Sequence, residues 1–120
     1  MGRVVKQLCV IIGILYCGST YGQSELEIFA ETSVVCVATL GMASILTESE
    51  LSKMVFTRDA KWWRSILLKV VDSSEADRRI EAEMKDIQTK WNDEKLSWNQ
   101  LLDIGQKCSE MKLTLESPSD

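Results

Sequence analysis

Two cysteines, Cys36 and Cys108, are the residues of this chain whose type most directly predicts covalent chemistry. The other two, Cys9 and Cys17, lie in an N-terminal segment that we expect to be removed from the protein. A reactive dithiol usually has the spacing Cys-x-x-Cys, and Cys36 and Cys108 are far apart. An even pair in an exported protein is typical of one disulfide, and two buried free thiols are the alternative. Closing a loop of about 70 residues would stabilise the fold by roughly 4 kcal/mol.

The chain contains no histidine, and this excludes several kinds of active site. It lacks the commonest general base and metal ligand, so Ser-His-Asp and Cys-His triads cannot form. Neither a glycine-rich phosphate loop nor a G-x-S-x-G motif occurs. Glu81, Glu83 and Asp86 are close in sequence, but acidic residues on a charged helix face are usually only solvated. We therefore expect a non-enzymatic protein without a metal or a cofactor.

Four tryptophans, against two phenylalanines and two tyrosines, form the second unusual group. Trp91 and Trp98 fall on an apolar helical stripe, which predicts a place in the core. Trp62 and Trp63 are adjacent, so on a helix one can be buried while the other lies at its margin. Exposed tryptophan beside basic residues is typical of binding hot spots. We predict a binding patch made of Trp62, Trp63, Met54 and Arg64, with Met42 as a further candidate.

The first 22 residues have the layout of a secretory signal peptide. Arg3 and Lys6 precede an apolar run over residues 8–16, and small residues follow it up to Gly22. The run is shorter than the roughly 20 apolar residues of a membrane-spanning helix. An uncleaved signal anchor and a lipoprotein acylated at Cys17 are the alternatives. We predict cleavage after Gly22 and a periplasmic or extracellular location.

Removal of residues 1–22 leaves 98 residues with all eighteen acidic and twelve of the fourteen basic side chains, a net charge of −6. An acidic chain without a basic stripe in its sequence is a poor partner for nucleic acid, whose phosphates require lysine and arginine. Contact with an anionic membrane surface is disfavoured for the same reason.

The mature chain is poor in helix-breaking residues, because its only proline is Pro118. We predict an all-α fold in which residues 23–115 form a small bundle of about four helices and residues 116–120 form a disordered tail. The first helix spans residues 24–46, and a capping box of Thr47 and Glu50 begins the second. Residues 57–59 are a candidate kink or break in the second helix, and Ser74 is a candidate cap of the third. The apolar stripe predicted for the second helix is Leu51, Met54, Val55, Trp62, Ile66 and Val70.

The first helix is apolar on nearly every side over residues 34–46. Such a helix is buried in a core or in a membrane. The stretch without charges, residues 32–47, is short for a membrane span, so we predict a buried central helix. Ala38 and Gly41 would allow a neighbouring helix to approach closely.

The third helix has the clearest apolar stripe, and it is expected to end at Asn92-Asp93 before a fourth helix over residues 94–113. The alternative is three helices, with one long C-terminal helix over residues 76–113. That helix would be about 57 Å long, too long for a compact domain of this size unless it forms a coiled coil. In an up-down-up-down bundle the first and last helices are antiparallel neighbours, which brings Cys108 to Cys36. The third-helix stripe is Ile80, Met84, Ile87 and Trp91.

Taken together, these features predict a small exported helical protein that acts by binding another protein, for example an inhibitor or an immunity protein. Its acidic surface would fit a partner with a basic site. In architecture alone the pattern resembles small exported helical proteins of bacteria, including some immunity proteins of secreted effectors, and no motif assigns a family. The alternatives are a carrier of a small apolar ligand in the bundle core and a membrane-associated protein with residues 34–46 inserted.

Overall fold

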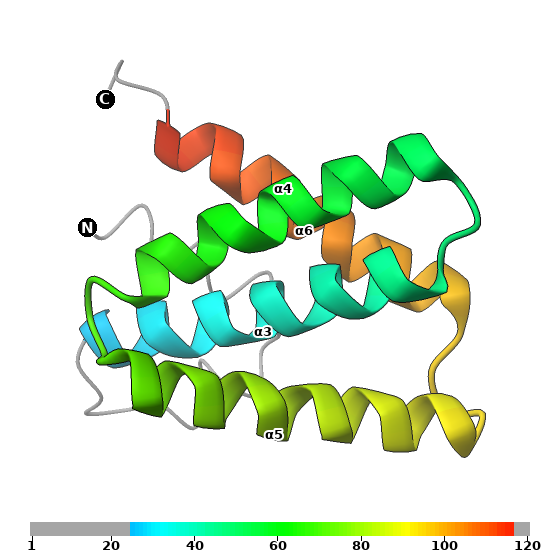
Figure 1. The fold of residues 1–120 in the computed structure, drawn as a ribbon, viewed down its shortest axis with the longest axis horizontal. Helices are drawn as coiled ribbons and strands as arrows, with labels where there is room; N and C mark the ends of the chain where they lie inside the picture. Colours follow the sequence, from blue (N-terminus) through cyan, green and yellow to red (C-terminus); the bar gives the residue numbers. More distant parts are fainter. Residues whose placement is uncertain (1–24, 117–120) are drawn as a thin grey trace.

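The structure, a computed structural model, describes residues 25–116, which fold into four α-helices (Figure 1). Within these residues the all-α prediction is confirmed, and the break before the last helix excludes one long C-terminal helix. The predicted signal peptide lies outside the described residues, as do residues 117–120 of the predicted tail, whereas Glu116 is still helical. The helices are α3 (Glu25–Leu46), α4 (Glu50–Leu67), α5 (Ser73–Asn92) and α6 (Trp98–Glu116).

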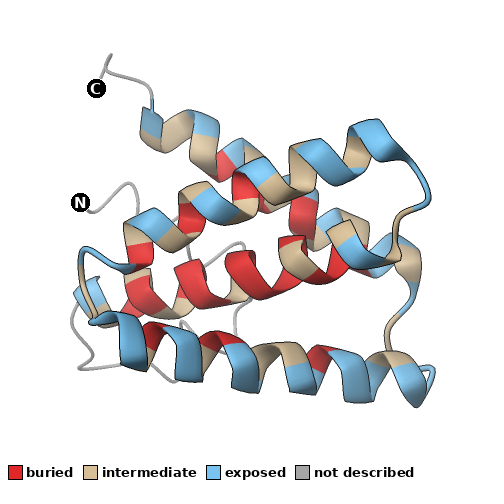
Figure 2. Cartoon of the chain, in the orientation of Figure 1, coloured by how far each residue is buried: buried red, intermediate tan, exposed pale blue. Residues whose placement is uncertain are grey.

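Helix α3 is the centre of the bundle, and α4, α5 and α6 all pack against it. Successive helices run in opposite directions, so α6 is antiparallel to α3 (Figure 1). Buried residues are concentrated along α3 and on the sides of the other helices that face it (Figure 2). Within residues 25–116, α3 alone is long and apolar enough to cross a membrane, but 61% of its most apolar 18-residue window is buried inside the bundle. This burial fits the predicted central helix.

The helix caps differ from those predicted for α4 and α5. The N-cap of α4 is Ser49, whose hydroxyl accepts a hydrogen bond from the backbone N–H of Ser52 at 3.2 Å. Thr47 lies outside the helix and accepts from the N–H of Ser49. The N-cap of α5 is Asp72 rather than Ser74, and it accepts from the N–H of Glu75 at 2.9 Å. A carboxylate is the stronger cap there because it also interacts with the positive end of the helix dipole.

The turn between α5 and α6 is longer than predicted, and local chemistry explains it. Glu94 has a backbone φ of 59°, the left-handed conformation that ends a helix. A new helix then begins with a reciprocal capping box that the sequence analysis missed: the Ser97 hydroxyl accepts from the N–H of Gln100, and the Gln100 side chain accepts from the N–H of Ser97. Helix α6 therefore starts at Trp98 and not at residue 94.

The predicted apolar stripe of α4 is wrong at its first residues, because Leu51 and Met54 are among the most exposed apolar side chains of the described chain. The inward side of α4 carries Phe56, Asp59, Ala60, Trp63 and Leu67, which have the spacing of one helix face. Residues 57–59 are helical, so the predicted break there is also wrong.

The predicted disulfide between Cys36 and Cys108 is confirmed, and it fastens α6 to the middle of α3. The two Cα atoms are 5.6 Å apart, and both cysteines are fully buried. Close packing surrounds the bond: Gly105 faces the Leu40 side chain, and the Trp63 indole N–H donates to the Cys108 carbonyl at 3.1 Å. This burial indicates a structural disulfide.

Replacement of both cysteines by alanine should lower the free energy of unfolding by about 4 kcal/mol, because the unfolded chain gains the entropy of an open loop. Urea unfolding followed by circular dichroism measures this change. A reductant should destabilise the natural protein and leave the double variant unaffected. An unchanged unfolding midpoint in the double variant would show that the bond does not constrain the fold.

Candidate functional site

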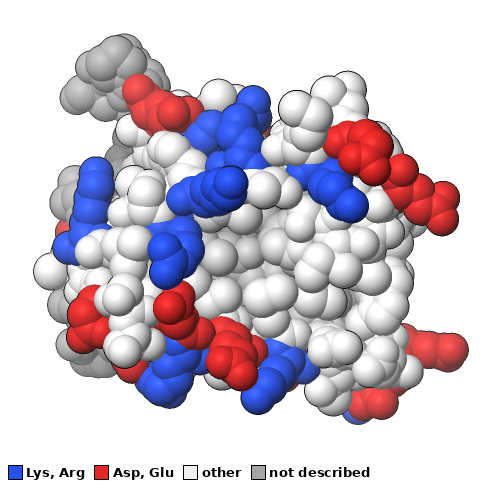
Figure 3. All heavy atoms as spheres, viewed as in Figure 1, with Lys and Arg blue, Asp and Glu red and all other residues white. Residues whose placement is uncertain are grey.

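Helices α4 and α5 lie on either side of α3 (Figure 1). An open groove of about 620 Å³ lies over α3 and α5 on the side that faces α4, and Arg64 is the residue of α4 that lines it. The space-filling view shows this hollow at the centre of the face, with an uncharged floor and charged edges (Figure 3). Its size is within the usual range for ligand sites. The apolar floor and walls include Val37, Met42, Ile80 and Met84, with Ile45, Leu46 and Trp91 also lining the groove. Its polar edges carry Arg64, Asp77, Glu81, Lys85, Gln88 and Asn92.

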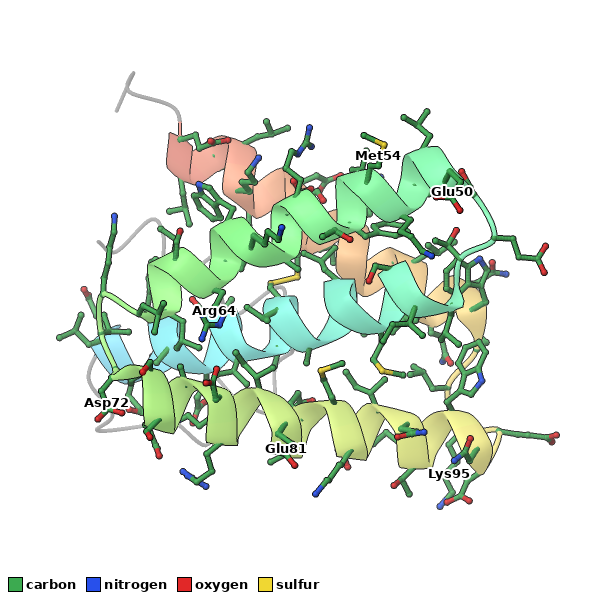
Figure 4. All side chains as sticks on the ribbon, in the orientation of Figure 1. Glu50, Met54, Arg64, Asp72, Glu81 and Lys95 are labelled. Carbon is green, nitrogen blue, oxygen red and sulfur yellow. A yellow bond between two sulfur atoms is a disulfide. The ribbon has the colours of Figure 1, made fainter. Side chains whose placement is uncertain are left out.

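The groove exists because the buried faces of α4 and α5 are both directed at α3. Trp63 and Leu67 anchor α4, and Ala76, Ile80 and Ile87 anchor α5. An Arg64–Asp77 ion pair spans the two helices at 2.8 Å, with side chains that are 41% and 64% exposed. Arg64 lies between α4 and α5 in Figure 4. An ion pair this exposed contributes about 1 kcal/mol or less, so a partner could displace it at little cost.

The structure separates the residues of the predicted binding patch. Met54 is 68% exposed on the outer side of α4, and Arg64 lies on the edge of the groove. Trp62 is half-buried and lines a different hollow. Trp63 is fully buried, and Met42, which is nearly buried, lies in the floor of the groove. Trp63 is buried because it continues the inward stripe of α4. The stripe predicted from the sequence contained Trp62 in its place.

Asp59, a carboxylate that is only 1% exposed between α4 and α6, was not among the residues predicted from the sequence. The Ser109 hydroxyl donates to its Oδ2 at 2.7 Å, and the Arg58 Nε–H donates to its Oδ1 at 3.0 Å. The Lys112 ammonium lies 3.4 Å from the same Oδ1 and 5.9 Å from the ring centre of Trp62. The sequence signal that could have identified Asp59 is its spacing, which places it on the inward stripe of α4.

Burial by itself would raise the pKa of Asp59, but the surrounding donors outweigh this effect. Hydrogen bonds from Ser109 and Arg58 and the positive charges of Arg58 and Lys112 hold the pKa below the ordinary value. The partners of the carboxylate come from α4 and α6, which fits a role in joining these two helices.

The three neighbouring carboxylates of α5 do not converge on one site. Glu81 and Asp86 are exposed and pair with Lys85 and Lys90. Glu83 is half-buried in a separate polar hollow between α3 and α5, where burial and then the charge of Asp86 raise its pKa. Within residues 25–116 no group of three or more histidine, cysteine or carboxylate side chains could hold a metal ion.

Comparisons with known proteins give no relative from which a function could be transferred. The chain matches no protein-family model, and neither the curated proteins nor the solved structures contain a significant match. The functional argument therefore depends on the groove and on the sequence.

Asp59→Asn should lower the free energy of unfolding at pH 7 by about 3 kcal/mol, because it leaves Lys112 beside an uncharged group. The natural carboxylate stabilises the fold above the unfolded-state pKa of about 3.9, and this contribution is lost as the pH falls through the lower folded-state pKa. Urea unfolding at several pH values should show the gap between the two proteins narrowing below about pH 4. Asp77→Asn, at the exposed pair, is the control and should cost about 1 kcal/mol or less. A gap independent of pH would contradict this role of Asp59.

Proposed function

We propose that this is a small exported, non-enzymatic helical protein that acts by binding another protein through the groove between α4 and α5. The observation that carries the proposal is the combination of an apolar groove with charged edges and an adjoining helix, α4, with exposed apolar side chains. Ile45, which lines the groove, is 65% exposed, and on α4 Leu51 is 73% and Met54 68% exposed, although all three are large and apolar. Exposed apolar side chains beside a groove are typical of interaction surfaces.

Export is supported by two independent features. The sequence of residues 1–22 has the layout of a signal peptide, and the Cys36–Cys108 disulfide is of a kind that persists in oxidising compartments. A periplasmic or extracellular inhibitor or immunity protein is one concrete form of this function.

The groove favours a helical partner segment. It runs between two antiparallel helices, and residues 25–116 contain no strand to whose edge an extended peptide could add. An amphipathic helix can lay its apolar side into such a groove. Displacement of the weak Arg64–Asp77 pair would open the end that this pair spans.

A photo-crosslinking amino acid tests the proposal directly. Placed at Gln88, on the edge of the groove, or at Met54, it should yield a discrete adduct with another protein in the exported fraction of the cells that make this chain. The matched control is the same amino acid at Asp103, an exposed position of α6 that does not line the groove. Equal labelling from all three positions, or no adduct from the first two, would contradict the proposal. An adduct only with a second copy would replace partner binding by self-association.

A second candidate function, transport of a small apolar ligand, is favoured by a separate hollow of about 340 Å³. The predicted place in the bundle core is filled by fully buried side chains such as Trp63, Leu40 and Leu101. The ligand would instead occupy this outer hollow, in which Lys69 is the only charged residue among the described residues that line it. Saturable quenching of tryptophan fluorescence by a brominated fatty acid, lost in Trp62→Phe, would favour transport. Absence of quenching would exclude it. The lining residues are Leu26, Phe29, Trp62, Ile66, Lys69, Val70 and Leu115.

A further inference from the structure

The basic residues of α4 are less fully neutralised than those of the other helices. Along α5, Arg78, Arg79, Lys85 and Lys90 all have carboxylate partners. Both basic residues of α6 are also paired, Lys107 with Asp103 and Lys112 with Asp59 and Glu116. The basic side chains without an ion pair within residues 25–116 are Lys53, Lys61, Lys69 and Lys95, and the first two lie on α4.

The cause lies in the orientation of α4. One of its two carboxylates, Asp59, is buried against α6, and the other, Glu50, is at its first turn. Lys53 and Lys61 consequently form no ion pair within residues 25–116, although Glu50 lies one turn before Lys53. Both lysines are exposed on the same helix as Leu51 and Met54. Figure 3 shows basic residues along the α4 edge of the hollow and mixed charges along the α5 edge. An acidic protein thus presents a basic ridge at its groove.

We propose that the segment bound at this groove is an acidic amphipathic helix of the partner protein. This inference rests on the function proposed above and specifies the chemistry of the partner. The apolar side of that helix would contact Ile80 and Met84, and its carboxylates would face Lys53, Lys61 and Arg64. The sequence analysis expected a partner with a basic site because the whole chain is acidic. At physiological salt, a charge acts over about 8 Å. The charges of the ridge that contacts the partner therefore determine the charge of the bound segment, and the net charge of the whole chain does not.

An anionic membrane is a less suitable occupant of the same surface. The α5 edge of the groove carries Asp77 and Glu81, which a flat anionic surface resting on α4 and α5 would meet at the same time as the lysines. A helix in the groove can present carboxylates to α4 alone. A protein segment therefore fits the charge pattern better than a lipid surface.

The methionines make the inference testable by NMR on the oxidised mature protein with ¹³C-labelled methyl groups. Met42 and Met84 line the groove and Met54 is on the outer side of α4, whereas Met111 is buried in the core. The probe is a synthetic amphipathic helical peptide with leucine on one face and glutamate on the others. It should shift the methyl signals of Met42 and Met84 more than that of Met111, and its affinity should fall as salt is added.

Charge reversal identifies the residues that recognise the peptide. Lys53→Glu with Lys61→Glu should weaken binding about tenfold or more, because like charges then meet across the interface. Lys95→Glu, which alters an unpaired lysine in the α5–α6 turn, is the matched control and should leave the affinity unchanged.

Three results would overturn the inference: equal or tighter binding of a peptide with lysine in place of glutamate, an equal loss in Lys95→Glu, or binding only to phosphatidylglycerol vesicles. If neither peptide binds while crosslinking at Gln88 yields a partner, the acidic helix is wrong and the proposed function stands. If crosslinking also fails, both are wrong.

Discussion

The apolar surface of α3 must be covered on nearly every side, and the arrangement of the other helices follows from this constraint. A soluble helix usually hides one stripe, but twelve residues of α3 are buried, including five consecutive residues from Cys36 to Leu40. Three helices are needed to cover it, and each directs its own apolar stripe at α3. The Cys36–Cys108 bond then fixes α6 against the middle of this helix.

The groove is a consequence of the same constraint. Because α4 and α5 are both directed at α3, they meet each other mainly through the exposed Arg64–Asp77 pair. The contact between α4 and α6 is different, since it contains the buried Asp59 with its donors on α4 and α6. Asp59 is the one carboxylate in the middle of α4, and it is used in this internal contact. The outward lysines of α4 are therefore left without an ion pair in the part of the chain that the structure describes. The charge pattern of the groove is therefore linked to how α6 is held.

Much of the fold followed from periodicity and residue type. The uniform apolar character of residues 34–46 predicted a central helix, the stripe of Ile80 and Ile87 predicted the inward side of α5, and cysteine number predicted the disulfide. Periodicity failed for α4, because the inward stripe contains a carboxylate while Leu51 and Met54 are apolar and exposed. Hydrophobicity does not reveal that Ser109 and Lys112, fifty residues or more along the chain, satisfy Asp59.

The candidate site could be predicted only in part. Of the residues in the predicted binding patch, Arg64 lies on the edge of the groove, whereas Met54 is exposed on the outer side of α4. The groove itself depends on the distance between α4 and α5, which no local sequence pattern specifies. For the same reason the ion pairing of each lysine, and hence the sign of the ridge, became visible only in the folded chain.

Native-state hydrogen exchange of the oxidised protein is the most direct test of α3 as the helix on which the others depend. We expect the backbone amides of residues 30–43 to exchange most slowly and only through global unfolding, while α5, which packs chiefly against α3, opens at a lower free energy. Exchange of α3 amides as fast as or faster than those of α5 would contradict a bundle organised around α3, and with it the physical origin of the groove.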